Sequence, residues 1–243
     1  MRFVQFGAAL VSLLLSVPAF AGPPFLTDDP KPTDYEHYEI YLFGNATFAS
    51  DGRGGDFGVD FNYGAMPDLQ LTAVLPVSYE LPEPGHAQAG VGNIELAAKF
   101  RVLHQESVGW DVAIFPRVFL KSPSDLGEQH AALLIPIWVG KDGENWSTFG
   151  GGGCELNHSG ASLNFCLAGW AFTWRAAEAL QIGAEVFHQG PDTKGGRAST
   201  ILGAGATYDI SENLHLLGYA GFGLQNTSET GRATAYVSML FTF

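Results

Sequence analysis

Apolar and polar side chains alternate at every second position through most of the chain after residue 35. In the last segment, the odd positions from Ala235 to Phe243 are apolar, and the even positions are Tyr236, Ser238, Leu240 and Thr242. Residues 54–64 repeat the pattern with Phe57, Val59 and Phe61 on one face. A period of two is typical of a β-strand whose two faces meet different surroundings. The pattern therefore predicts strands, most of them about ten residues long.

Applied to the whole chain, this pattern predicts about twelve strands, near residues 36–49, 54–65, 69–79, 91–103, 109–120, 131–141, 145–154, 164–175, 180–189, 198–209, 214–224 and 233–243. The connections alternate between short turns, such as 66–68 and 142–144, and longer polar loops, such as 80–90 and 121–130. Short periplasmic turns and long outer loops alternate in this way in outer-membrane barrels. Residues 35–243 are therefore predicted to be all-β: a transmembrane antiparallel up-and-down β-barrel with both termini periplasmic.

The first 21 residues have the features of a secretion signal. Arg2 precedes an apolar run, and Ala19-Phe20-Ala21 has the small-x-small form of a cleavage site. A transmembrane anchor is the alternative, but the apolar run is shorter than a spanning helix needs. We expect cleavage after Ala21 and export to the outer membrane.

Residues 22–34 form a proline-rich lead that cannot be a strand. Two possibilities stay open from the sequence. The lead is either a disordered segment or a rigid one that lies at the periplasmic mouth and folds partly into the lumen.

The charge content of the chain indicates which kind of partner it has. Charged residues make up 15% of the chain, which is low for a soluble domain. Once Arg2 is removed with the signal, 11 Lys and Arg remain against 25 Asp and Glu, a net charge of −14. Binding to phosphate backbones needs basic surface, so nucleic acid is excluded as a partner, and the lipid bilayer is the expected one.

With the apolar faces toward lipid, the charged strand residues point inward. The predicted lumen-lining residues are Glu39, Asp60, Glu95, Lys99, Arg101, Arg117, Arg175 and Glu185, and Asp111 and His215 share this orientation. These charges either pair with each other, Glu95 with Lys99 or Arg101 for example, or select a solute. Tyr41, Phe115 and Tyr219 are the aromatic residues expected to fill a lumen that is closed.

Two cysteines, Cys154 and Cys166, predict a disulfide in an exported protein. A metal site formed by both cysteines and His158 is the alternative, although its spacing is unusual. His158 beside Ser159 is the only candidate for hydrolytic chemistry, and sequence neighbours rarely form a catalytic pair. Residues 150–153 lack the Lys-Ser/Thr that a phosphate loop requires. We therefore expect no catalytic residues, no metal, no cofactor and no enzyme activity.

Three further features concern the membrane. Val237, Met239, Phe241 and Phe243 are expected to form a terminal signal for the outer-membrane assembly machinery. Trp110, Trp138, Trp146 and Trp174 lie beside the short turns, with Trp170 further in, and are expected to form an interfacial girdle. Pro76, Pro116 and Pro136 fall inside predicted strands, which implies either bulges or misplaced boundaries.

Three stretches resemble a known family: the mature start at residues 22–30, the hairpin at 63–71 and the strand at 91–101. They are similar to the outer-membrane family labelled "MetA-pathway of phenol degradation", whose members are often called transporters. The resemblance covers most of the mature chain except residues 146–165. It implies a barrel that passes small solutes, aromatic or hydrophobic compounds among them, and implies no catalytic residues.

Four hypotheses follow. The leading one is an outer-membrane channel or transporter for small solutes. The alternatives are a structural or interaction barrel with a plugged lumen, a lipid-acting enzyme that uses His158 and Ser159, and a soluble periplasmic β-protein.

Overall fold

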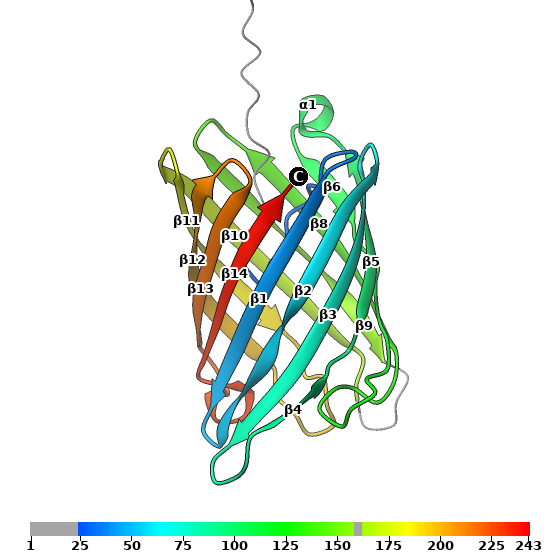
Figure 1. Ribbon diagram of the computed structural model, residues 1–243, viewed down its shortest axis with the longest axis vertical. Coiled ribbons are helices and arrows are strands. Elements are labelled where there is room, and N and C mark those ends of the chain that lie inside the picture. Colours follow the sequence, from blue (N-terminus) through cyan, green and yellow to red (C-terminus); the bar gives the residue numbers. More distant parts are fainter. Residues whose placement is uncertain (1–23, 158–161) are drawn as a thin grey trace, which may run out of the picture.

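The chain folds into a closed antiparallel β-barrel in a computed structural model that describes residues 24–157 and 162–243 (Figure 1). The predicted signal segment, its cleavage site, and His158 and Ser159 lie outside the described residues. Within the described part, the strands are β1 (Tyr38–Ala49), β2 (Gly52–Met66), β3 (Leu69–Pro82), β4 (Gln88–Val91), β5 (Glu95–Leu103), β6 (Asp111–Ile114), β7 (Arg117–Phe119), β8 (Ala132–Asp142), β9 (Trp146–Asn157), β10 (Phe165–Ala177), β11 (Leu180–Gln189), β12 (Ser199–Ser211), β13 (Leu214–Gly223) and β14 (Ala233–Thr242). Two four-residue helical turns, α1 (Gln105–Val108) and α2 (Thr227–Thr230), complete the elements.

Consecutive strands are neighbours around the wall, and β14 pairs with β1 to close the sheet. The closing register runs from Glu39 opposite Thr242 to Phe48 opposite Ala233. β4 and β5 both pair with β3, so together they form one interrupted strand. In the same way β6 and β7 both pair with β5 and with β8, and together they form a second interrupted strand. The barrel therefore has twelve strand positions, as predicted.

The three prolines have different effects on the sheet. Pro116 separates β6 from β7, whereas Pro76 and Pro136 remain inside β3 and β8. The backbone N–H of Phe115 still bonds to the Pro136 carbonyl (3.0 Å), and that of Ala98 to the Pro116 carbonyl (3.1 Å). The break between β6 and β7 at Pro116 therefore stays hydrogen-bonded to both neighbouring strands, β5 and β8.

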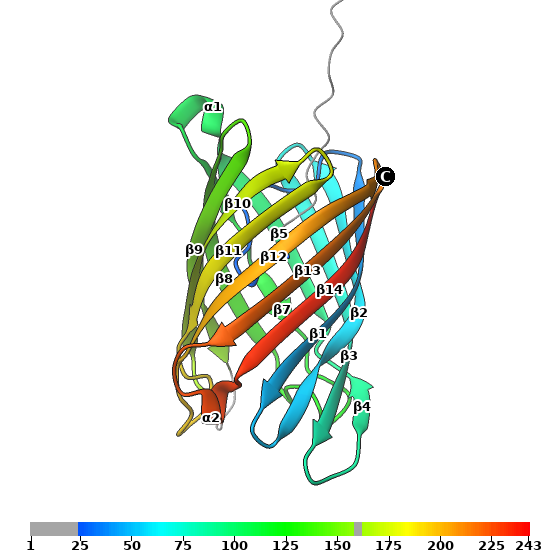
Figure 2. The same cartoon turned by 90° about the vertical axis from the view of Figure 1, so that its left-hand side faces the viewer.

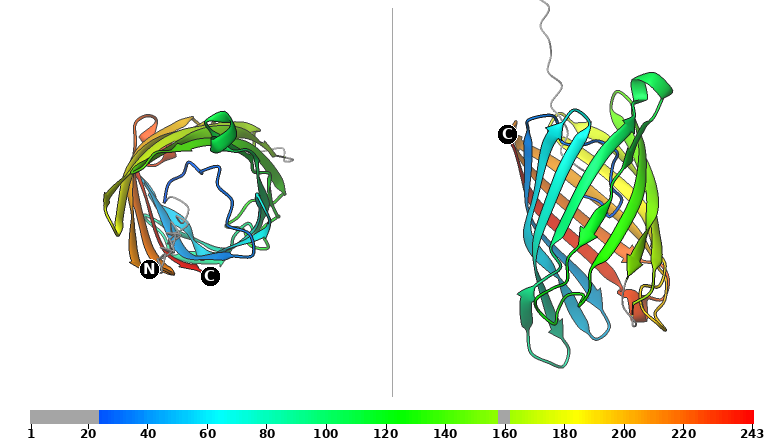
Figure 3. Two further views of the ribbon diagram at one scale, coloured as in Figure 1. Left: turned by 90° about the horizontal axis from the view of Figure 1, so that it is seen from above. Right: turned by 90° about the vertical axis from the view of Figure 1, so that its right-hand side faces the viewer.

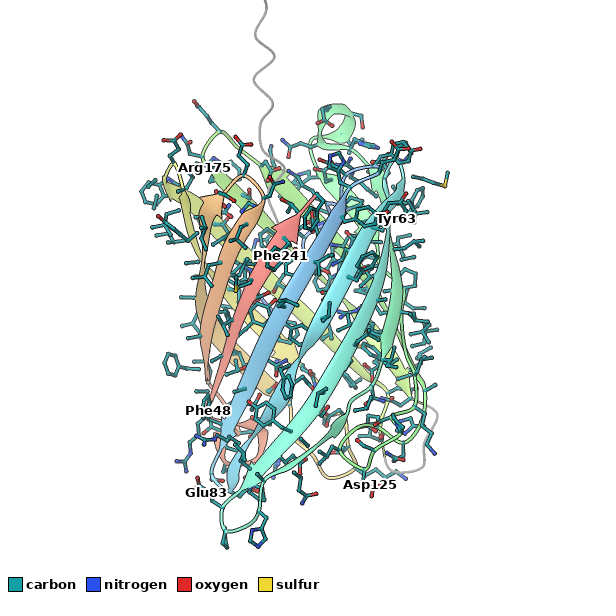
Figure 4. The ribbon with its side chains drawn as sticks, viewed as in Figure 1. Phe48, Tyr63, Glu83, Asp125, Arg175 and Phe241 are labelled. Carbon is teal, nitrogen blue, oxygen red and sulfur yellow. A yellow bond between two sulfur atoms is a disulfide. The ribbon has the colours of Figure 1, made fainter. Side chains whose placement is uncertain are left out.

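The two ends of the barrel differ. The short turns, α1 and the C-terminal Phe243 lie at one end, and the long loops with β4 and α2 lie at the other (Figures 1 and 2). At the first end Tyr38 and Phe243 exchange backbone hydrogen bonds of 3.0 and 3.1 Å. In Figure 4, Arg175 and Tyr63 mark this short-turn end, and Glu83 and Asp125 mark the loop end. No helix in the described part of the chain is long and apolar enough to span a bilayer.

The outer face of the wall is a belt of exposed apolar side chains. Along β8, Ile135 and Ile137 are 44% and 49% exposed, whereas Leu134 before them and Trp138 after them are 3% and 1% exposed. The same outward set recurs around the wall in Leu42, Phe57, Leu75, Leu96, Phe172, Val186, Leu202, Phe222 and Val237. Since lipid offers no partners for backbone polar groups, a closed sheet with an apolar outer belt is the form in which strands cross a bilayer.

The tryptophans follow the prediction with one exception. Trp110, Trp146, Trp170 and Trp174 are exposed on the outside, and Trp110 contacts the Trp170 ring edge-on at 6.4 Å. Trp138 does not belong to this girdle, because it alternates with Ile137 and therefore points inward. Gly151 of β9 lies opposite Trp138, and its lack of a side chain allows the β8 backbone to approach closely, since a Cβ there would meet the Ile137 carbonyl oxygen at 2.1 Å.

Candidate functional site in the barrel lumen

The proline-rich lead does not stay outside the barrel. Residues 24–34 cross the interior near the short-turn end, as the view along the barrel shows (Figure 3). Thr27 is fully buried, and Pro24, Pro30 and Thr33 are buried as well. Of the two possibilities left by the sequence, the structured lumen segment is the one adopted for these residues.

Glu185 of β11 is the main attachment of this segment. Its carboxylate accepts the backbone N–H of Leu26 at 3.0 Å and that of Thr27 at 2.9 Å. Glu185 is 2% exposed and lies behind the segment, and it borders neither of the two chambers described below. The sequence placed Glu185 among the residues of a possible solute path; in the structure its carboxylate faces inward and is bound by the lead.

Other wall residues hold the rest of the segment. Lys99 of β5 donates to the Asp28 carboxylate at 2.9 Å. Lys31 pairs with Asp142 at the end of β8. The Gln70 side-chain oxygen accepts the Thr33 backbone N–H at 2.8 Å. Phe25 packs edge-on against the Tyr219 ring at 5.9 Å.

Two titratable side chains of the lead, Asp29 and Lys31, have raised pKa values. Burial raises the pKa of the Asp29 carboxyl above its ordinary value; Lys99 opposes that rise and Asp28 adds to it. Burial by itself would lower the pKa of Lys31, but the hydrogen bond and charge of Asp142 outweigh it, and the pKa of Lys31 is raised. The second shift favours the charged form that pairs with Asp142.

Open space remains on both sides of a central group of residues. A vestibule of about 1320 Å³ occupies the loop end. An inner chamber of about 720 Å³ lies beside the lead. Both cavities are lined by Asn45, Thr47, Asp60, Glu95, Arg117 and Tyr236, so the two chambers adjoin at these residues.

Arg117 and Glu95 form the tightest ion pair at this junction. Arg117 Nε and one terminal nitrogen each donate to a different Glu95 oxygen at 2.7 Å. The paired geometry fixes both side chains in a way that a single contact would not. Asp60, on β2, accepts a hydrogen bond from the Asn62 amide at 2.9 Å. In the residues the structure describes, Asp60 forms no ion pair.

The one pairing predicted among the inward charges differs from the pairing observed. Glu95 was expected to pair with Lys99 or Arg101 and pairs with Arg117 instead, because Arg117 of β7 lies on the adjacent strand. Lys99 reaches the lead, and Arg101 pairs with Asp68 at 2.7 Å and approaches Asp111 at 3.7 Å. Glu39 accepts the Tyr41 hydroxyl at 3.0 Å. His215 lies 2.7 Å from Asp209.

Six of the eight predicted lining residues border the two chambers: Glu39, Asp60, Glu95, Lys99, Arg101 and Arg117. Arg175 lines a separate pocket of about 210 Å³ at the short-turn end, where it donates to the Glu178 carbonyl. Tyr41, Phe115 and Tyr219 are 8%, 4% and 6% exposed and fill part of the interior.

Sequence reasoning missed two residues that hold the lead, Gln70 and Asp142, and the lead residue Thr27. Gln70 is inward on a predicted strand, a signal that could have singled it out. Asp142 lies in a turn, where an acidic residue is too common to attract notice.

Cys154 and Cys166 form the predicted disulfide and lie directly opposite each other on β9 and β10. With both sulfur atoms bonded to each other, the alternative metal site loses its thiolate ligands. A different group, His104, Glu106 and Asp111 near α1, brings its ligand atoms within 4.8 Å of one another. There Asp111 already accepts the Gln105 N–H and His104 lies 3.1 Å from Asp68, so we assign no metal to the group.

A closed barrel with an apolar outer belt, a polar interior and chambers on either side of a charged junction defines a membrane β-barrel of the outer-membrane type. The chain has the fold of outer-membrane channels. It superposes on the COG4313 outer membrane channel from Pseudomonas putida F1 with a TM-score of 0.65 at 15% identity, covering 88% of this chain and 99% of that one. It superposes on the NanC porin with a TM-score of 0.61 at 7% identity, covering 83% and 98%.

The translocator domain of the autotransporter NalP from Neisseria meningitidis has the same fold with a TM-score of 0.52 at 13% identity, covering 87% of this chain and 90% of that one. No family model and no curated protein matches the sequence. At these identities the likeness shows the fold, and it agrees with the outer-membrane family that the sequence resembles.

Proposed function

We propose that this protein is an outer-membrane channel that conducts small solutes through its lumen. The observation that carries the proposal is the pair of adjoining chambers, of about 1320 and 720 Å³, in the interior. A barrel of about eight strands is filled by its own side chains, and the diameter grows with the number of strands, so twelve strand positions leave room for these chambers. The fold shared with outer-membrane channels supports the same function.

The proposed path starts among the long loops, crosses the vestibule, passes Asp60, Glu95 and Arg117, and continues beside the lead to the short-turn end. The resemblance to the phenol-degradation family suggests aromatic or hydrophobic solutes. Phe115, Tyr41 and Tyr236 offer aromatic surface along the inner chamber. The remaining lining is mostly polar and charged, and it favours small hydrophilic solutes as well.

We infer the orientation of the barrel from the lengths of its connections. We place the short turns, the lead and Phe243 in the periplasm and the long loops outside, as outer-membrane barrels have them. Residues 1–21 would act as the cleaved export signal, and residues 237–243 as the signal for the assembly machinery.

A second candidate, a barrel whose lumen is plugged, rests on one observation: residues 24–34 occupy the interior near the short-turn end. Flux through the purified protein in liposomes separates the two. The probes are small ions, a neutral sugar and a phenolic compound, and the matched variant lacks residues 24–34.

Flux through the intact protein supports the channel, and a higher flux in the deletion variant assigns the lead as a partial restriction. Flux in the deletion variant alone supports a barrel that is closed by its lead. A lack of flux in both, with the barrel folded as judged by gel mobility before and after boiling, overturns the channel proposal.

A further inference from the structure

The vestibule at the loop end carries an unbalanced set of charges. Its lining contains Asp60 and Glu95, together with the carboxylates of Asp51, Asp56, Glu80, Asp125 and Glu128. The basic groups among the described lining residues are the guanidinium groups of Arg53 and Arg117 and the imidazole of His130. This space is therefore strongly acidic.

The inner chamber is closer to balance. Lys31, Lys99, Arg101 and Arg117 line it, and Asp28, Asp29, Asp34, Glu39, Asp60 and Glu95 provide the opposite charge. Each of these four cations is held by a carboxylate: Lys31 by Asp142, Lys99 by Asp28, Arg101 by Asp68 and Arg117 by Glu95. In the described lining of the vestibule, by contrast, the guanidinium groups of Arg53 and Arg117 are set against seven carboxylates.

The junction between the chambers retains a negative charge. Arg117 and Glu95 neutralise each other through two hydrogen bonds of 2.7 Å. Asp60 lines both chambers, and among the described residues it accepts a hydrogen bond from the neutral amide of Asn62. The three side chains together carry a net charge of −1 when Asp60 is ionised.

A solute that crosses this path meets a field of one sign in a space with low-dielectric walls. Such a field concentrates cations and depletes anions, and rings of carboxylates give cation channels their preference. We infer that the channel prefers small cations to anions and that Asp60 is the residue that sets this preference at the junction. The inference rests on the proposed channel function and names the class of solute that it favours.

The test is the reversal potential of the purified protein in planar lipid bilayers across a KCl gradient at pH 8. The intact protein should give the sign for potassium preference, with a K⁺ to Cl⁻ permeability ratio of several-fold. Asp60→Asn keeps the size of the side chain and its acceptor oxygen for Asn62, and should lower the ratio at least twofold with the conductance retained. Glu178→Gln, which removes an exposed carboxylate in the β10–β11 turn outside both chambers, should leave the ratio unchanged.

The outcomes separate the two proposals. A conductance with a ratio of one or less overturns the cation preference and leaves the channel. A preference that Asp60→Asn does not change overturns the assignment of Asp60. A folded protein without any conductance overturns the channel and the inference with it.

Discussion

The Glu185 carboxylate accepts the backbone N–H of Thr27 at 2.9 Å, across 158 residues of sequence. A second oxygen of the same carboxylate accepts the Leu26 N–H. The buried Glu185 carboxylate of β11 thereby accepts two backbone N–H groups of the lead, which has no neighbouring strand to bond to them. Unpaired buried backbone groups are costly, so this contact fixes where the lead lies in the lumen.

Replacing Glu185 should therefore release the lead. Hydrogen bonds to a charged group are worth about 1.5–3 kcal/mol each, and Glu185→Ala removes two of them. The population with the lead displaced should rise at least about tenfold, since 1.4 kcal/mol corresponds to a factor of ten. Single-channel recordings should show more frequent or larger openings, and protease should cut residues 24–34 faster.

Glu185→Gln is the matched variant, because its amide oxygen can still accept one of the two N–H groups. It should give an intermediate effect. If Glu185→Ala leaves both the openings and the protease sensitivity unchanged, Glu185 does not determine the position of the lead.

Asp29 makes the docking of the lead dependent on pH. Burial raises its pKa in the docked state above the value of a solvated aspartate. The docked state therefore binds the proton more readily, so docking strengthens as the pH falls through the raised pKa and weakens as the pH rises again. Lys99, Asp28 and Lys31 face this carboxyl, and their charges are part of the balance.

We expect conductance to fall when the pH is lowered from 7 to 4. Asp29→Asn mimics the protonated form and keeps an acceptor oxygen for the Lys31 backbone N–H. Its conductance should be lower at pH 7 and should change less with pH than that of the intact protein. A variant with the full pH response would assign the titration to another group of the lumen.

The Cys154–Cys166 bond closes a short loop at the loop end of the β9–β10 hairpin. In the chain-entropy model such a loop contributes at most about 3 kcal/mol to stability. The hairpin also keeps a ladder that extends from Phe165 opposite Glu155 to Trp174 opposite Trp146, so the barrel should survive reduction. A reducing agent should lower the midpoint of urea unfolding, measured by tryptophan fluorescence, and should leave the folded gel mobility unchanged.

The double variant Cys154→Ser/Cys166→Ser should show the lower midpoint without a reducing agent and no further response to one. A response of equal size in the double variant would mean that the reducing agent acts elsewhere.

The sequence predicted the wall much better than the interior. Period-two alternation is a local property, so it located the strands of the barrel and the outward face of residues such as Val237 and Phe57. Trp138 was misplaced because its position beside a turn was given more weight than its alternation with Ile137. The interruption at Pro116 was anticipated, but the hydrogen bonds that bridge it were not.

The partners inside the lumen depend on which side chains face each other across the barrel, and a periodic pattern does not contain that information. Glu95 meets Arg117 because β5 pairs with β7 in one particular register. Lys99 meets Asp28 because the lead turns into the lumen, which a proline-rich composition neither requires nor forbids. The inward charges could thus be predicted, whereas their pairing could not.

The end of β14 offers a test of the predicted assembly signal. Phe243 is 61% exposed, and Val237 and Met239 share its outward face at 56% and 41%. In the folded barrel, Phe243→Ala removes a side chain with few buried contacts, so it should change the unfolding midpoint little. If the assembly machinery reads this residue, the amount of folded protein in the outer membrane should fall several-fold.

Phe222→Ala is the matched control, since Phe222 on the neighbouring β13 is equally aromatic, faces outward and is 65% exposed. It removes the same apolar surface without touching the last strand. Both variants are compared with the intact protein by the fraction that migrates as a folded barrel in unboiled samples of outer membrane. A loss confined to Phe243→Ala assigns a recognition role to the terminal residue. Equal losses in both variants would instead attribute the effect to reduced contact with lipid, which every residue of the belt shares.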